Sequence, residues 1–205
     1  MTPSVCLVVE GVTDLAILQR LLGELRVTVG PTHVTDGTAK LDRQLAGYNS
    51  ASKYGPWLVV RDLDQDAACA PELLRGLLPE PAMHIRLRVA VRAVESWLLA
   101  DGTAISRFLG VAKSRVPADP DVLVDPKGTI VSLARLSRRS EVKQMAPSPR
   151  SGRRVGPAYT DQIIHFAATG WRPVEAAKHS PSLSSTIRAI REWVVDGTPV
   201  CAEPE

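Results

Sequence analysis

The chain has 205 residues, of which 44% are hydrophobic and 23% charged, and its formal net charge is +3. This length suits one substantial domain, or one domain with a small appendage, and the composition is ordinary for a soluble globular protein. No stretch is apolar over the roughly 20 residues that a membrane helix needs, and no basic leader with a cleavage site opens the chain, so we expect a cytoplasmic protein without a membrane partner.

Strand-like and helical patterns alternate over the first hundred residues. Apolar runs predict strands at residues 4–9, 57–60 and 85–91, and a weaker strand at 27–34 that Gly30 and Pro31 interrupt. Helical spacing or a polar intervening stretch predicts helices at residues 13–25, 38–50, 71–78 and 93–100. Alternation of this kind implies an α/β fold with a mostly parallel sheet flanked by helices. The last strand alternates apolar residues with Arg86 and Arg88, as a strand with one solvent-facing side does.

The pattern changes after Asp101. Several prolines mark a loop-rich connection, and helices are expected at residues 129–139, 159–168 and 183–195, before a polar tail at 198–205. We therefore divide the chain into a core at residues 1–101 and a mainly helical extension at 102–205 that packs on the core. Trp97 and Trp193 lie at helical positions among aliphatic residues, so we assign both to the hydrophobic core.

Positive charge is concentrated in the extension. Residues 135–154 carry seven basic side chains against the single acid Glu141, a local excess of six charges. The basic residues are Arg135, Arg138, Arg139, Lys143, Arg150, Arg153 and Arg154. A basic loop at residues 135–157 suits the phosphate backbone of a nucleic acid, and the competing interpretation is a solvated basic loop.

Acidic residues follow three of the predicted strands. Glu10 follows the first, Asp62 and Asp64 follow the strand at 57–60, and Glu95 comes soon after the strand at 85–91. Ligands of open α/β sheets bind at the carboxyl ends of the strands. Asp62 and Asp64 are two residues apart, so in an extended segment both side chains project to the same side. Carboxylates gathered in this way repel one another, and a hard cation such as Mg²⁺ or Mn²⁺ relieves the repulsion.

Each motif also has a purely structural interpretation. An Asp-x-Asp sequence after a strand is a common turn and helix cap, and Thr13 can cap a helix whose dipole favours Asp14. Both motifs, however, follow apolar strands in the same order of strand, acid and helix. We therefore favour a metal site built from Glu10, Asp62 and Asp64, with Asp14 and Glu95 as further ligands.

These motifs resemble the signature of the Toprim superfamily. Glu10-Gly11-Val12-Thr13-Asp14 and Val59-Val60-Arg61-Asp62-Leu63-Asp64 are similar to its glutamate after the first strand and its later Asp-x-Asp. The superfamily includes topoisomerases, primases, recombination proteins and the overcoming-lysogenization-defect nucleases. Residues 91–101 and Asp125-Pro126-Lys127 also resemble a bacterial Toprim-like family catalogued as a domain of unknown function, which extends the likeness over most of the chain.

The resemblance implies a Rossmann-like Toprim fold that uses Mg²⁺ or Mn²⁺ for phosphoryl transfer. It implies that Glu10, Asp62 and Asp64 are the core catalytic acids, while Asp14 and Glu95 match acids of the nuclease branch, for which two bound metals are expected. A topoisomerase is disfavoured because the chain has no room for a separate tyrosine-bearing domain. A primase is disfavoured because no zinc module precedes the acidic motifs.

Two basic residues near these motifs have two interpretations each. Lys127 stands at a predicted helix start, where it either neutralises charge on a reacting phosphate and orients water, or is a solvated lysine. Arg61 either contacts the scissile phosphate or pairs with neighbouring aspartates.

The sequence thus supports two functional hypotheses. The first is a metal-dependent nuclease of DNA or RNA, as an effector of bacterial phage defence, with Glu10, Asp62, Asp64, Glu95 and Lys127 as catalytic residues. The second is a non-catalytic module that binds metal or nucleic acid, or acts as a sensor. An ATPase partner fits both, because related bacterial families often lie beside ATPases and this chain has no Walker-type loop of its own.

Overall fold

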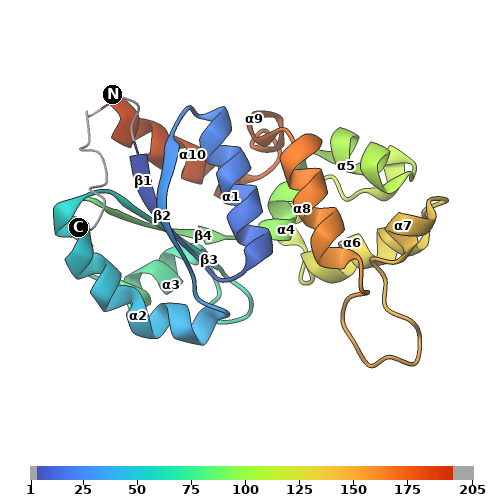
Figure 1. Cartoon of the computed structure of the whole chain (residues 1–205), viewed down its shortest axis with the longest axis horizontal. Coiled ribbons are helices and arrows are strands. Elements are labelled where there is room, and N and C mark those ends of the chain that lie inside the picture. Colours follow the sequence, from blue (N-terminus) through green and yellow to red (C-terminus); the bar gives the residue numbers. More distant parts are fainter. Residues whose placement is uncertain (1–3, 196–205) are drawn as a thin grey trace.

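A four-stranded parallel sheet forms the centre of the computed structural model, which describes residues 4–195 (Figure 1). The strands are β1 (Ser4–Val9), β2 (Thr28–Val34), β3 (Trp57–Asp62) and β4 (Ile85–Ala90), in the order β2-β1-β3-β4. The α/β class and the parallel sheet expected from the sequence are confirmed. The polar tail expected at residues 198–205 lies outside the described range.

Helices cover both faces of this sheet. Helix α1 (Val12–Glu24) packs its leucines and isoleucine on Val5, Leu7 and Val9 of β1. Helix α2 (Thr38–Ala51) places Leu41 and Leu45 on the opposite face, and α3 (Ala70–Leu77) lies beside it (Figure 1). Side chains that alternate along a buried strand face opposite sides, which is why both faces of β1 are apolar and both are covered.

The prediction that one face of β4 is exposed to solvent is wrong. The last helix, α10 (Pro181–Val195), lies over that face (Figure 1). Arg88 donates from Nη2 to Ser185 Oγ at 2.5 Å, and the Arg86 guanidinium lies 5.0 Å from the Trp193 ring centre. The long arginine stems therefore lie under a helix while their charged ends reach polar or aromatic partners.

The second half of the chain is helical, as expected. It contains α4 (Val94–Ala100), α5 (Gly102–Leu109), α6 (Pro126–Arg135), α7 (Ser140–Lys143), α8 (Tyr159–Thr169) and α9 (Pro173–Ala176). Single 3₁₀ turns cover Ser52–Tyr54, Lys113–Arg115 and Pro120–Val122. The helix expected at 129–139 begins earlier, because Asp125 caps it and Pro126 occupies its first turn, and it ends earlier, at Arg135. Within the basic stretch at 135–157, residues 140–143 are helical rather than loop.

One hydrophobic cluster continues from the sheet into the helical extension. It joins β1 and α1 to Trp97 of α4, to Phe166 of α8 and to Trp193 of α10, and it confirms that both tryptophans belong to the core. None of the helices in residues 4–195 combines the length and apolar character that crossing a bilayer requires.

The order of the strands reverses between β1 and β3. From β1 the chain moves outward to β2 through α1, then returns over the other face through α2 to β3 on the opposite side of β1. The loops that leave β1 and β3 therefore diverge to opposite faces of the sheet, which is the arrangement at which ligands of open α/β sheets commonly bind. Glu10 and Asp62 stand at the carboxyl ends of these two strands.

Candidate metal and phosphate site

A cavity of about 460 Å³ opens beyond the carboxyl ends of β3 and β4. Its wall combines acids from the sheet with bases from the loops and the helical extension. The charged residues that line it are Asp62, Asp64, Asp66, Glu95, Asp125, Arg92, Lys127 and Arg154.

Asp62 lies where several carboxylates converge. Its Oδ1 accepts a hydrogen bond from the backbone N–H of Val94 at 2.9 Å, at the start of α4. Burial raises the pKa of Asp62 well above its ordinary value, and the charges of Glu95 and Asp14 raise it further. Glu10 and Asp64 contribute in the same direction. These acids therefore lie close enough to Asp62 to oppose its charge, while their sharing of one metal stays a prediction.

The carboxylate of Glu10 contacts the backbone N–H of Asp62 and makes no hydrogen bond to the Asp62 carboxylate. Its Oε1 accepts from the Asp62 N–H at 2.9 Å, and its Oε2 accepts from Thr38 Oγ1 at 2.6 Å. Both oxygens thus have a donor, and Glu10 is not part of the cavity wall.

The expected Thr13 cap is wrong, because α1 begins at Val12 with Gly11 as its N-cap, and Asp14 lies in the first turn. Its Oδ2 accepts from the Gly11 N–H at 2.8 Å at the start of α1. It is nonetheless electrostatically coupled to the cluster, since burial and then the charge of Glu95 raise the pKa of Asp14 to about 6.

Asp64 does not lie in an extended segment. Strand β3 ends at Asp62, and Asp64 follows in a turn with φ of 46°, a left-handed conformation that aspartate tolerates better than most residues. Its backbone is fixed to the next loop, because its N–H donates to Arg92 O and Arg92 Nη1 donates to Asp64 O, both at 2.9 Å. The expected extended geometry is wrong, but Asp64 still lines the same cavity as Asp62.

Glu95 is the most deeply buried acid of the site, with 1% of its surface exposed. Its Oε1 lies 3.1 Å from the Tyr159 hydroxyl, which donates to it, and 3.3 Å from Lys127 Nζ. In the described part of the chain its Oε2 is buried without a hydrogen-bond partner. A buried oxygen without a donor calls for an explanation, and a bound cation supplies one.

Lys127 extends from the first turn of α6 into the cavity wall. Burial lowers its pKa, but the charge of Glu95 and its hydrogen bond, followed by Asp62 and Asp14, raise the pKa of Lys127 above the ordinary lysine value overall. The ammonium group therefore stays charged and offsets part of the negative charge of the cluster.

A hard divalent cation is the kind of ion that carboxylate oxygens favour. Among residues 4–195, no group of three or more His, Cys, Asp and Glu side chains is arranged so that it could hold a metal ion. Mg²⁺ commonly binds through one or two carboxylates and keeps several waters. Two of the cavity acids Asp62, Asp64 and Glu95 would meet that smaller requirement.

Arg61 pairs with aspartates, as one of its two interpretations expected. Its partners, however, are not its chain neighbours Asp62 and Asp64. It is 3% exposed, and its guanidinium donates to Asp42 at 2.9 Å and to Asp66 at 2.5 Å. Despite its burial, these two carboxylates raise the pKa of Arg61. With its donors used inside the protein, Arg61 is not placed to receive a phosphate as predicted.

One arginine of the basic stretch reaches the cavity. Arg154 lines it, with Nη2 3.4 Å from Asp125 Oδ1. Arg139 instead donates to the carbonyl of Phe108 at 3.1 Å, while Arg138, Arg150 and Arg153 are exposed. The basic surface and the acidic cavity are therefore adjacent at Arg154.

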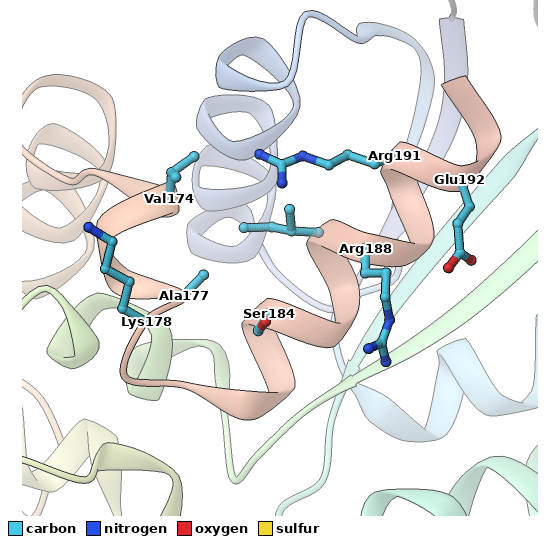
Figure 2. Close-up of a pocket in the computed structure, with 8 residues that line it drawn as sticks. Val174, Ala177, Lys178, Ser184, Arg188, Arg191 and Glu192 are labelled. Atoms are coloured by element: carbon cyan, nitrogen blue, oxygen red, sulfur yellow. The ribbon is translucent and has the colours of Figure 1, made fainter. Parts of the chain in front are cut away.

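A larger cavity of about 740 Å³ lies between α9 and α10. Figure 2 shows Arg191 extending across it from α10, with Lys178 on the opposite wall. Glu192 is the acid in its lining, and none of the acidic motifs reaches it. We place the candidate site in the smaller cavity, because clustered ionisable groups with shifted pKa values are typical of functional sites.

The sequence did not indicate three residues of the site. Thr38 and Tyr159 stand at predicted helix starts, and nothing in their surroundings in the sequence points to Glu10 or Glu95. Arg92 follows β4 at its carboxyl end, so the rule that selected the acids would also have selected it.

Comparison of the chain with protein-family models, curated proteins and solved structures finds no match.

Proposed function

We propose that this protein is a nuclease that hydrolyses phosphodiester bonds of DNA or RNA with the help of Mg²⁺ or Mn²⁺. The observation that carries the proposal is the composition of the cavity at the β3 and β4 ends. It brings Asp62, Asp64 and the unpaired oxygen of Glu95 together with three cationic side chains. Oxygen ligands beside phosphate-binding bases are what metal-assisted phosphoryl transfer requires.

The acids would hold the cation. Asp62, Asp64 and Glu95 line the cavity, and Glu10 orients Asp62 through its backbone N–H. When bound, the cation lowers the pKa of water and stabilises negative charge on the phosphate. Without it, the carboxylates would repel the phosphodiester, so we expect binding of substrate to depend on metal as well.

The bases would hold the phosphodiester. Lys127 remains protonated beside Glu95, so it donates hydrogen bonds and does not accept the proton of the attacking water. Arg92 and Arg154 stand on the same wall, where a guanidinium can contact two phosphate oxygens at once. The exposed Arg138, Arg150 and Arg153, with Arg139, would extend this contact along the nucleic-acid backbone.

The Toprim resemblance supports the same reaction and two of its three core acids, Asp62 and Asp64, whereas Glu10 would act through the Asp62 backbone. With this resemblance we propose a cytoplasmic role in phage defence, with an ATPase as the partner that switches the nuclease on.

Cleavage assays test the proposal directly. We expect the purified chain, with its candidate ATPase where one is encoded nearby, to cut DNA or RNA with Mg²⁺ or Mn²⁺ and not with EDTA. The double variant Asp62→Asn, Asp64→Asn should lose this activity. A matched double variant, Asp161→Asn with Glu192→Gln, removes two exposed acids outside the cavity and should retain it. Metal binding without cleavage in the reconstituted pair would instead identify a non-catalytic module.

A further inference from the structure

Tyr159 connects the helical extension to the acidic cavity. It is the first residue of α8 and is 3% exposed, and its hydroxyl donates to Glu95 Oε1 at 3.1 Å in a buried hydrogen bond. No other residue of α8 takes part in the hydrogen bonds or ion pairs of the acids described above.

The two donors to Glu95 differ in how firmly they are held. The Lys127 side chain is 41% exposed and lies on a long flexible stem. Tyr159 instead lies on the buried face of α8, whose Ile163 and Phe166 are part of the main hydrophobic cluster. The phenol is therefore the donor that a change at the cavity mouth is least able to displace.

The phenol can act only as a donor here. A carboxylate oxygen has no proton to give, so the hydroxyl is the donor in this bond. Oε1 of Glu95 is thus engaged on the protein side, and Oε2 is the oxygen that stays unpaired.

We propose that Tyr159 is a positioning residue, which fixes Glu95 so that Oε2 is presented to the divalent cation. The proposal rests on the proposed function, and it makes the helical extension part of the metal site rather than an appendage. Groups that hydrogen-bond to a metal ligand commonly change metal affinity or activity by about 10-fold to 100-fold when they are removed.

The first test compares two variants that each remove one phenol oxygen. Tyr159→Phe removes the hydrogen bond to Glu95, whereas Tyr48→Phe removes a hydrogen bond of 2.7 Å to Gln44 on the exposed side of α2. Free Mn²⁺ in equilibrium with each protein is measured by electron paramagnetic resonance. We expect about tenfold weaker Mn²⁺ binding for Tyr159→Phe and an unchanged affinity for Tyr48→Phe. An affinity within twofold of the wild type for folded Tyr159→Phe overturns the proposal.

The second test uses the wild-type chain, so it does not depend on the folding of Tyr159→Phe. The sequence has three tyrosines, Tyr48, Tyr54 and Tyr159, so ¹³C labelling of the phenol carbon gives three signals. The variants Tyr48→Phe and Tyr54→Phe assign two of them. Addition of Mg²⁺ should shift the Tyr159 signal and leave the other two in place. If Mg²⁺ binds without shifting it, the positioning role fails alone, whereas a chain that binds neither Mg²⁺ nor Mn²⁺ refutes the proposed function itself.

Discussion

Asp14 is a buried acid whose surroundings oppose its charge. Burial and the neighbouring charge of Glu95 raise its pKa from 3.8 to about 6, although the Gly11 N–H partly compensates. Between these two values the folded protein binds more protons at Asp14 than the unfolded chain does. The free energy of unfolding therefore falls as the pH rises from about 4 to about 6, and the loss persists above that range.

We predict that Asp14→Asn stabilises the metal-free protein above pH 6. The amide oxygen of asparagine still accepts from the Gly11 N–H, while the unfavourable charge is gone. At pH 8 in EDTA we expect a gain of about 1–3 kcal/mol in the free energy of unfolding, and at pH 4 almost none. Urea denaturation at both pH values measures the difference. A variant less stable than the wild type at pH 8 would show that the carboxylate is needed for the cap.

The candidate site shows which residue roles can be inferred from the sequence. Glu10, Asp62 and Glu95 were selected by one local rule, that acids follow strands, and the parallel sheet brings them together. The pairing of Arg61 with Asp42, and of Tyr159 with Glu95, depends on contacts between segments 19 and 64 residues apart. No pattern of spacing within one element predicts such contacts.

At the scale of single elements, the N-terminus of α6 combines a helix cap with an ion pair. Asp125 accepts from the Gly128 N–H at 2.9 Å, and the same oxygen lies 3.4 Å from Arg154. The ion pair is exposed, so its net contribution is at most about 1 kcal/mol and a phosphate can replace the carboxylate. Under the proposed function, Asp125 would therefore compete with a phosphate for Arg154.

We predict that two substitutions of Asp125 separate these roles. Asp125→Ala removes the cap and should cost about 1 kcal/mol of stability, whereas Asp125→Asn keeps an acceptor and should cost less. Both should bind a fluorescent oligonucleotide more tightly at low salt, because Arg154 is released. In an Arg154→Gln background this gain should shrink. An equal gain with and without Arg154 would mean that the carboxylate acts only through general repulsion.

The loop at residues 146–156 is closed at its base by a glycine that has no room for a side chain. Gly156 donates from its N–H to Met145 O at 2.8 Å. A Cβ at this position would lie 2.2 Å from the backbone oxygen of Gln144 and 2.4 Å from that of Ala146. The backbone atoms cannot move aside without opening the loop that carries Arg150, Arg153 and Arg154.

We predict that Gly156→Ala lowers the free energy of unfolding by about 1–3 kcal/mol and weakens nucleic-acid binding. Gly47→Ala is the control, because position 47 lies inside α2 with no atom within 4 Å of an added Cβ. Alanine there should stabilise the protein by up to about 1 kcal/mol, since it favours the helix. Thermal denaturation and oligonucleotide binding compare the two. A harmless Gly156→Ala would show that the loop base adjusts freely.

The elements themselves were predicted where their signal is local. Apolar runs located all four strands, and helical spacing located α1, α8 and α10. The covered face of β4 was mistaken for an exposed one, because the helix that covers it begins at Pro181, about ninety residues later. Asp64 was wrongly expected in an extended segment. Its turn is fixed by Arg92, which lies 28 residues away and which no local pattern reveals.

At the scale of the whole molecule, opposite charges are separated over a short distance. The net charge of +3 is small, yet acids line the cavity together with Arg154, which belongs to the basic stretch. A polyanion is therefore attracted to the basic surface and repelled by the adjacent acids unless a cation neutralises them. Metal and nucleic acid should accordingly strengthen each other's binding.

The salt dependence of binding measures how many phosphates the basic stretch neutralises. We predict that Arg150→Gln with Arg153→Gln lowers the slope of log affinity against log salt by roughly two, and weakens binding evenly across sequences. The matched control is Arg188→Gln with Arg191→Gln, which removes the same charge from the larger cavity on α10 (Figure 2). Anisotropy titrations at several salt concentrations, with and without Mg²⁺, give both slopes.

The outcome separates local contact from overall charge. If only the Arg150 and Arg153 pair changes the slope, the phosphate backbone runs along the loop at residues 146–156, in which Arg154 lines the cavity. If both pairs lower the slope equally, the net charge of the molecule attracts nucleic acid and the loop has no special role. A path that ends at Arg154 is the one that would deliver a phosphodiester to Asp62, Asp64 and Glu95, because Arg154 is the residue of the basic stretch that lines their cavity.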